Sequence, residues 1–115
     1  DGCDPRVARL YEPLHPAVLR VVSEVLAAGR RAGVPVAVCG EMAADPLSAL
    51  ALVGLGAREL SMTPAALPRV KEALRAVEVR QLEHELQGCL GLDGAAEVAA
   101  VLRRACREAV PAPAP

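Results

Sequence analysis

The sequence predicts an α/β fold in which two short parallel strands are joined by a helix. Residues 34–39 are almost continuously apolar, a pattern typical of a parallel strand that is covered on both faces. Residues 58–62 form a second short run of strand character. Between the two runs, Asp45 and Pro46 supply an N-cap and a first-turn proline, which mark the start of a helix. This order is typical of a βαβ unit, whose crossover is right-handed.

Further helices are expected on both sides of this unit. The predicted helices, including the one between the strands, span about 16–32, 46–54, 64–77, 78–88 and 94–109. The first begins at His15-Pro16, because proline is tolerated in the first helical turn, and Gly33 is its expected C-cap. Residues 1–15 are expected to be irregular. His15 precedes a proline at a helix start and is interpreted as a surface or capping residue. His84 lies in a charged helix and is interpreted as a solvated side chain.

Two parallel strands are too few for a stable sheet, since both edges stay open for pairing. We therefore expect further strands to come from elsewhere in a longer protein or from another chain. Residues 1–75 are expected to form one portion of the fold, and residues 76–109 a set of C-terminal helices. Residues 110–115, rich in proline and alanine, are expected to be a disordered tail.

The composition argues against several classes of protein. Of the 115 residues, 13 are basic and 14 acidic, and only 1% are aromatic, so nucleic-acid binding has no support. No apolar run approaches the roughly 18 residues of a membrane span. The first residues lack the charged and apolar regions of a signal peptide. A cytoplasmic protein without membrane insertion is expected.

The four cysteines show no pattern typical of a zinc site. None is spaced as CxxC and neither histidine adjoins one. Scattered thiols without a signal peptide suit a reducing compartment. The cysteines are Cys3, Cys39, Cys89 and Cys106.

Cys39 differs from the other three because it ends an apolar strand and is followed by Gly40 and Glu41. Glycine allows another group to approach the backbone closely. On this pattern alone, a cysteine after a strand is more often a small buried hydrophobic residue than a catalytic group.

Four sequence motifs, one of which contains Cys39, resemble those of a known family. They are LYEPLHPAVL at 10–19, VCGEMAAD at 38–45, LGARELSM at 55–62 and PRVK at 68–71. In this order and spacing they resemble the phosphoenolpyruvate-binding barrel of enzyme I, the phosphoenolpyruvate-protein phosphotransferase of the sugar phosphotransferase system. The resemblance runs from about Asp1 to Arg75 and covers only the C-terminal part of that barrel.

The resemblance implies a fragment of an eight-stranded β/α barrel in which residues 34–39 and 59–62 form the last two strands. Cys39 would then lie at the carboxyl ends of the strands, where barrel enzymes place their chemistry. It matches the family's proton donor to enolpyruvate, and Gly40 and Glu41 are candidate substrate-binding residues. Thiols suit this task, since their ordinary pKa of about 8.5 keeps most of them protonated near neutral pH.

For the whole enzyme, the resemblance implies phosphoryl transfer from phosphoenolpyruvate to an enzyme histidine and then to the carrier protein HPr. It also implies Mg²⁺, with ligands outside this chain, and a homodimer. The chain alone is expected to be inactive. One departure is Gly2, which replaces the arginine of the family's Asp-Arg-Gly-Asn stretch. The alternatives are a fragment of a pyruvate phosphate dikinase or phosphoenolpyruvate synthase relative, and a non-catalytic remnant or interaction module.

Overall fold

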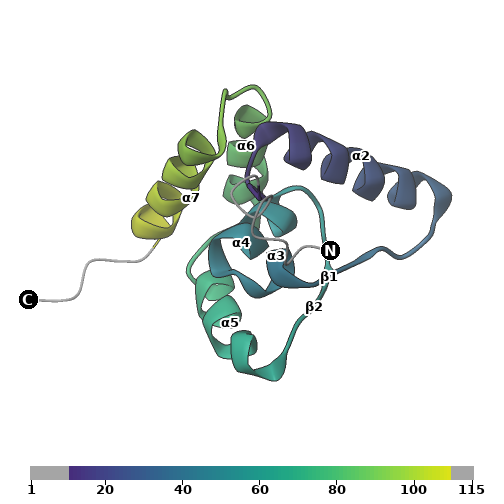
Figure 1. The fold of residues 1–115 in the computed structure, drawn as a ribbon, viewed down its shortest axis with the longest axis horizontal. Coiled ribbons are helices and arrows are strands. Elements are labelled where there is room, and N and C mark those ends of the chain that lie inside the picture. Colours follow the sequence, from purple (N-terminus) through teal and green to yellow (C-terminus); the bar gives the residue numbers. More distant parts are fainter. Residues whose placement is uncertain (1–10, 110–115) are drawn as a thin grey trace, which may run out of the picture.

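The computed structural model describes the backbone of residues 11–109 and the side chains of residues 11–107 (Figure 1). The elements are α2 (Pro16–Ala32), β1 (Ala37–Cys39), α3 (Glu41–Ala44), α4 (Pro46–Gly54), β2 (Glu59–Ser61), the 3₁₀ helix η1 (Pro64–Ala66), α5 (Leu67–Arg75), α6 (Val79–Cys89) and α7 (Ala95–Ala109). The α/β class is confirmed. The tail expected at 110–115 and most of the irregular segment expected at 1–15 lie outside the described residues, and the division at residue 75 stays a prediction.

Strands β1 and β2 form a parallel pair, as the strand–helix–strand order predicts. The register aligns Ala37 with Glu59, Val38 with Leu60 and Cys39 with Ser61. Both strands have three residues, so the predicted strands at 34–39 and 58–62 are too long. The two carboxyl ends coincide, which brings the loops that follow β1 and β2 to the same edge of the sheet.

The prediction that the first strand is covered on both faces is wrong for the described residues. Val38 and Leu60 pack against the core, whereas the residues on either side of them in each strand are exposed. Successive strand residues point to opposite faces, and aligned residues of neighbouring strands share a face. One face of the sheet therefore packs on the helices, and the other carries the exposed side chains of Ala37, Cys39, Glu59 and Ser61.

Helix α4 is the centre of the fold. It contacts α5, α6 and α7, which surround it in Figure 1. The sequence predicts one buried side for this helix, but every residue from Ser48 to Leu52 is buried. Leu47 and Val53 are also partly buried against the core. Because helices lie on several sides of α4, it needs an apolar surface almost all round.

Capping residues explain where the helices begin and end. His15 caps α2, since its Nδ1 accepts a hydrogen bond of 3.0 Å from the backbone N–H of Ala17, and Gly33 ends this helix at φ +68°. Asp45 caps α4 through a 2.9 Å bond from the N–H of Ser48 to its Oδ2. All three caps were expected. The cap of α6 was not, because Glu78 is an uncommon N-cap type.

The predicted helix at 64–77 is divided in the structure. A 3₁₀ turn, η1, precedes α5, and the helix ends at Arg75. Each end of the last two predicted helices lies within one residue of the corresponding end of α6 or α7. No helix among the described residues has both the length and the apolar character needed to cross a bilayer.

Candidate active site at the carboxyl ends of the strands

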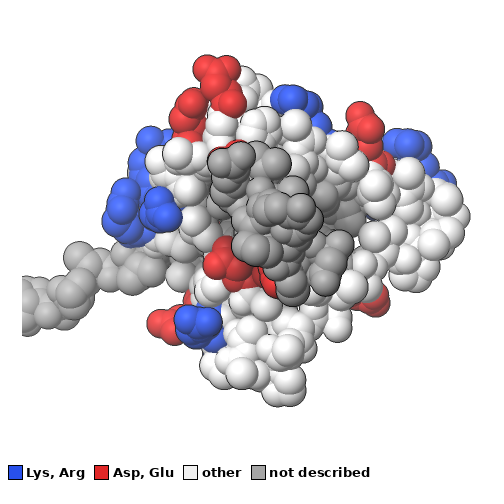
Figure 2. All heavy atoms as spheres, in the orientation of Figure 1, with Lys and Arg blue, Asp and Glu red and all other residues white. Residues whose placement is uncertain are grey.

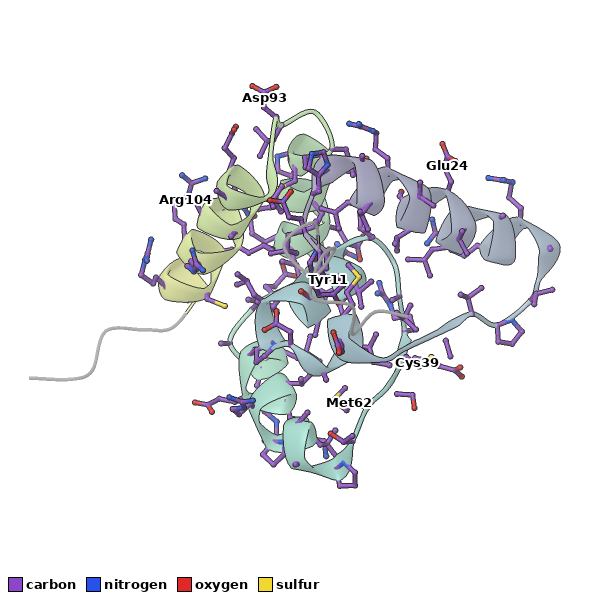
Figure 3. The ribbon with its side chains drawn as sticks, viewed as in Figure 1. Tyr11, Glu24, Cys39, Met62, Asp93 and Arg104 are labelled. Atoms are coloured by element: carbon purple, nitrogen blue, oxygen red, sulfur yellow. The ribbon has the colours of Figure 1, made fainter. Side chains whose placement is uncertain are left out.

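Cys39 is the last residue of β1 and lies beside Ser61, the last residue of β2. Its side chain is exposed and lies on the sheet face that no described helix covers. Figure 3 shows Cys39 and Met62 on the side of the molecule away from α6 and α7. The structure thus presents this thiol at the predicted end of the strand, in a position that an external molecule can reach.

Gly40 turns the chain directly from β1 into α3. Its dihedral angles are φ +90° and ψ −160°, a conformation that residues with a side chain rarely adopt. A Cβ at this position would meet no atom within 4 Å, so the requirement for glycine comes from the backbone conformation and not from crowding. The carbonyl of Gly40 accepts a 3.2 Å hydrogen bond from Ala44 N–H, which closes the first turn of α3.

Glu41 begins α3, two residues after Cys39, and is exposed. Tyr11 lies within the electrostatic field of this carboxylate. Although 56% of Tyr11 is exposed, its partial burial raises the pKa of the hydroxyl, and the negative charges of Glu41 and Asp45 raise the pKa further. The structure therefore brings Tyr11 near the loop that follows Cys39, a neighbour that the sequence interpretation did not single out. The sequence signal that could have identified Tyr11 is its position within the motif at 10–19.

The other described cysteines are not brought to this edge. Cys89 is buried on α6, and Cys106 is partly buried on α7. Burial is the main cause of the raised pKa of both thiols, and Glu85 adds to the effect at Cys89. The sequence favours packing or surface thiols over metal ligands at both positions, and their burial agrees with this expectation. His84 is exposed, as expected. Cys3 and Gly2 lie outside the described residues.

A metal site is not formed by the described residues. Residues 11–107 contain no group of three or more His, Cys, Asp and Glu side chains close enough to hold an ion together. The exposed carboxylate of Glu41 alone does not make a magnesium site, because Mg²⁺ requires near-octahedral oxygen coordination. The described part of the chain therefore does not fit Mg²⁺ as a resident metal.

Charge is distributed without one dominant sign. On the face in Figure 2, acidic and basic side chains lie in small separate groups, with uncharged surface between them. No continuous basic surface of the kind that nucleic acids require is visible on this face.

Comparisons with known proteins agree with the resemblance found in the sequence. The family described as "PEP-utilising enzyme, PEP-binding domain" matches residues 1–79. A phosphoenolpyruvate-protein phosphotransferase of Cupriavidus necator is 47% identical over 107 residues, 93% of this chain and 18% of that protein. One from Borreliella burgdorferi is 39% identical over 97 residues, 84% of this chain and 17% of that protein. The Escherichia coli protein named "Phosphoenolpyruvate-dependent phosphotransferase system" is 38% identical over 98 residues, 85% of this chain and 13% of that protein.

The chain thus spans less than a fifth of the length of these relatives. The family match covers 79 of the 115 residues, including both strands and the site around Cys39. The chain belongs to the family of phosphoenolpyruvate-utilising enzymes and contains part of its phosphoenolpyruvate-binding domain.

Proposed function

We propose that this chain supplies one edge of the active site of a phosphoenolpyruvate-protein phosphotransferase, with Cys39 as the proton donor to enolpyruvate. The observation that carries the proposal is the exposed thiol at the coinciding ends of two parallel strands. The names of the relatives supply the reaction class. Ligand sites in parallel α/β folds lie outside the carboxyl ends of the strands, the edge where Cys39 lies.

The proton balance of the proposed step is simple. Phosphoenolpyruvate loses its phosphoryl group to a histidine nitrogen supplied by another part of the enzyme, which leaves the enolate of pyruvate. Carbon 3 of the enolate takes the proton from the Cys39 S–H, a C–H bond forms, and pyruvate and a thiolate result. The thiolate then regains a proton from water, which its exposure permits. Carbon protonation is slow without a positioned acid, so the thiol's placement matters for the rate.

A closed barrel would complete the site. The sheet face that carries Cys39, Ser61 and Glu59 is uncovered, as are both outer edges of the two-stranded pair within the described residues. In a β/α barrel, alternate strand residues point toward the barrel axis and the others toward the helices. Val38 and Leu60 already pack on the helix side, which assigns the Cys39 face to the barrel interior in this proposal.

Helix α2 carries a second uncovered surface that a barrel would use. Val18, Val21 and Val25 lie on one helical face and are 40%, 61% and 52% exposed. An apolar stripe of this length on a helix is normally covered by a neighbouring element. In the proposed barrel that neighbour is the helix of the preceding βα unit.

The remaining parts of the proposal concern the whole enzyme. Phosphoenolpyruvate is the substrate, and the histidine of HPr is the acceptor of the phosphoryl group. The enzyme acts as a homodimer in the cytoplasm, a compartment that suits the free thiols Cys39, Cys89 and Cys106. Magnesium would supply charge neutralisation for phosphoryl transfer, and its ligands are expected outside the described residues.

The test is pyruvate formation from phosphoenolpyruvate by the complete protein that carries this sequence, with HPr as acceptor. Cys39→Ala is expected to lower kcat by about 10²–10⁴-fold, the usual contribution of a general acid. Cys106→Ala, which removes a thiol on α7, is the matched control and should leave kcat within about twofold. An unchanged kcat in Cys39→Ala would remove the role proposed for this residue.

A further inference from the structure

A basic hollow lies at the opposite end of the strands from Cys39. It has a volume of about 640 Å³, and its lining includes the charged residues Arg30, Arg58, Arg80 and Glu83 and also His84. Three arginines against one glutamate leave a formal excess of two positive charges. Gly54, the last residue of α4, and the following Leu55 and Gly56 also line it. Because this segment precedes β2, the hollow adjoins the amino ends of the strands and is separate from the proposed catalytic edge.

Arg58 is fixed in this hollow by its own contacts. Its Nη1 donates to the carbonyls of Val53 and Ala57 at 3.0 and 2.8 Å, and its Nη2 donates to Glu83 at 3.0 Å. The pair is largely exposed, with 58% and 46% of the two side chains accessible, so it contributes little to stability. The ion pair holds the Arg58 guanidinium in a defined place, and it neutralises the negative charge of Glu83 in the lining.

The end of the Arg30 side chain lies against Gly56. This glycine has φ +112°, and a Cβ there would collide with Nη1 of Arg30. The absence of a side chain therefore gives the guanidinium of Arg30 room above the turn between α4 and β2. Within residues 11–107, neither Arg30 nor Arg80 has an ion-pair partner. Two guanidinium groups thus lie at the hollow with no counter-charge from the described residues.

A smaller apolar hollow adjoins the basic one. It has a volume of about 240 Å³ and shares Arg30, Gly56 and Arg58 with its neighbour. Its remaining lining is apolar and consists of Leu26, Val34, Pro35 and Val36. The two hollows together offer arginine side chains beside a compact apolar surface. The volume of the smaller one suits a small ring or branched group and not a long acyl chain.

We propose that the two hollows form a binding site for a soluble phosphate monoester with a small apolar substituent. Arg30 and Arg80 would bind the phosphate, because guanidinium groups match its oxygens with paired, charge-assisted hydrogen bonds. The two uncompensated positive charges balance a phosphate dianion, and His84 offers a further ring nitrogen. The substituent occupies the apolar hollow. This site does not depend on the proposed function, since it shares no residue with the edge around Cys39.

The test is calorimetric titration of the complete protein that carries this sequence with phenyl phosphate, inorganic phosphate and benzoate. Phenyl phosphate is expected to bind saturably and at least fivefold more tightly than either of the other two probes. Arg30→Gln and Arg80→Gln should each raise its Kd by about fivefold or more. Arg31→Gln is the matched control, because it removes a neighbouring arginine of the same helical turn that lines neither hollow. Its Kd should stay within twofold of the parent value.

Three results would overturn the proposal. The first is the absence of saturable binding by phenyl phosphate. The second is binding that Arg30→Gln and Arg80→Gln leave unchanged, since the ligand would then occupy another site, such as the proposed catalytic edge. The third is benzoate binding as tightly as phenyl phosphate, which would refute recognition of phosphate. Loss of turnover in Cys39→Ala bears on none of these results, so the two proposals can fail separately.

Discussion

Cys39 and Ser61 are aligned partners at the last rung of a parallel two-stranded ladder, and both side chains lie on its exposed face. This relationship follows from the period-two alternation of strand residues, because Val38 and Leu60, one position earlier, point to the helices. A shift of one residue in register would turn the thiol into the core. The exposed thiol therefore depends on the register of β1 as much as on the identity of residue 39.

Thiol accessibility gives the first prediction. Cys39 is exposed, whereas Cys89 is 1% exposed and burial raises the pKa of both Cys89 and Cys106. A thiol reacts as its thiolate, so a raised pKa and burial both slow modification. At pH 8, an alkylating reagent should modify Cys39 at least tenfold faster than Cys89 or Cys106.

Peptide mapping by mass spectrometry measures these rates. A Cys3→Ser background confines the comparison to the three described cysteines. Equal rates at Cys39 and Cys89 under native conditions would contradict the buried position of Cys89 on α6.

The turn after Cys39 gives the second prediction. Gly40→Ala should lower the free energy of unfolding by about 1–3 kcal/mol, because alanine is strained at φ +90°. Gly88→Ala is the matched control. Gly88 lies within α6 without a positive φ, and a Cβ there meets no atom within 4 Å. Alanine in a helix is about 0.5–1 kcal/mol better than glycine, so this variant should be neutral or more stable.

Denaturant titration followed by circular dichroism compares the two variants. If both glycines tolerate alanine equally, the backbone conformation assigned to Gly40 is wrong.

Tyr11 gives a pH-dependent prediction that absorbance can follow, since the chain has one tyrosine and no tryptophan. Burial, Glu41 and Asp45 all raise its pKa above 10.0. The folded state therefore binds this proton more tightly than the unfolded state does. Stability from this group is intact below pH 10 and is lost as the pH rises through the folded pKa.

Absorbance at the tyrosinate band should give a midpoint above that of a free tyrosine. Glu41→Gln should move the midpoint part of the way back, because burial and Asp45 remain. Glu24→Gln changes an exposed carboxylate on α2 and serves as the control. A midpoint unaffected by Glu41→Gln would mean that Tyr11 does not lie near the loop after β1.

The contact between α4 and α6 gives a packing prediction. A Cβ on Gly54 would lie 2.7 Å from Cγ of Leu86 and 3.1 Å from the carbonyl of Leu82. Gly54→Ala should therefore destabilise the fold by about 1–3 kcal/mol through overpacking. In a Leu86→Ala background the same change should cost much less, because the side chain that obstructs it is gone.

A double-mutant cycle from chemical denaturation measures this coupling. Additive effects of the two substitutions would show that Gly54 and Leu86 are not in contact.

Much of the fold could be predicted from the sequence because its signals are local. His15, Asp45 and the prolines after them mark helix starts through hydrogen bonds within three residues. The apolar run at 34–39 placed Cys39 at a strand end, and the four motifs indicated the family, which the comparisons confirm. The carboxyl-terminal helices also matched, since their apolar periodicity is strong.

The errors concern tertiary context. The apolar run at 34–39 resembles a strand buried on both faces, but only one face of β1 is covered by described residues. Helix α4 was assigned one buried side, although its neighbours α5, α6 and α7 bury it almost all round. The approach of Tyr11 to Glu41 joins residues 30 positions apart, and no local pattern encodes such a distance. The basic hollow likewise combines three separate segments.

The stereochemistry of proton addition at carbon 3 of enolpyruvate tests the role of Cys39 most directly. Stereospecifically tritiated phosphoenolpyruvate is converted by the complete protein in deuterium oxide, and the configuration of the resulting chiral methyl group of pyruvate is determined. A thiol fixed on one side of the enolate predicts one configuration for the parent protein and a racemic methyl group for whatever pyruvate Cys39→Ala still releases. Retention of the single configuration in Cys39→Ala would show that another group delivers the proton and would contradict the central claim.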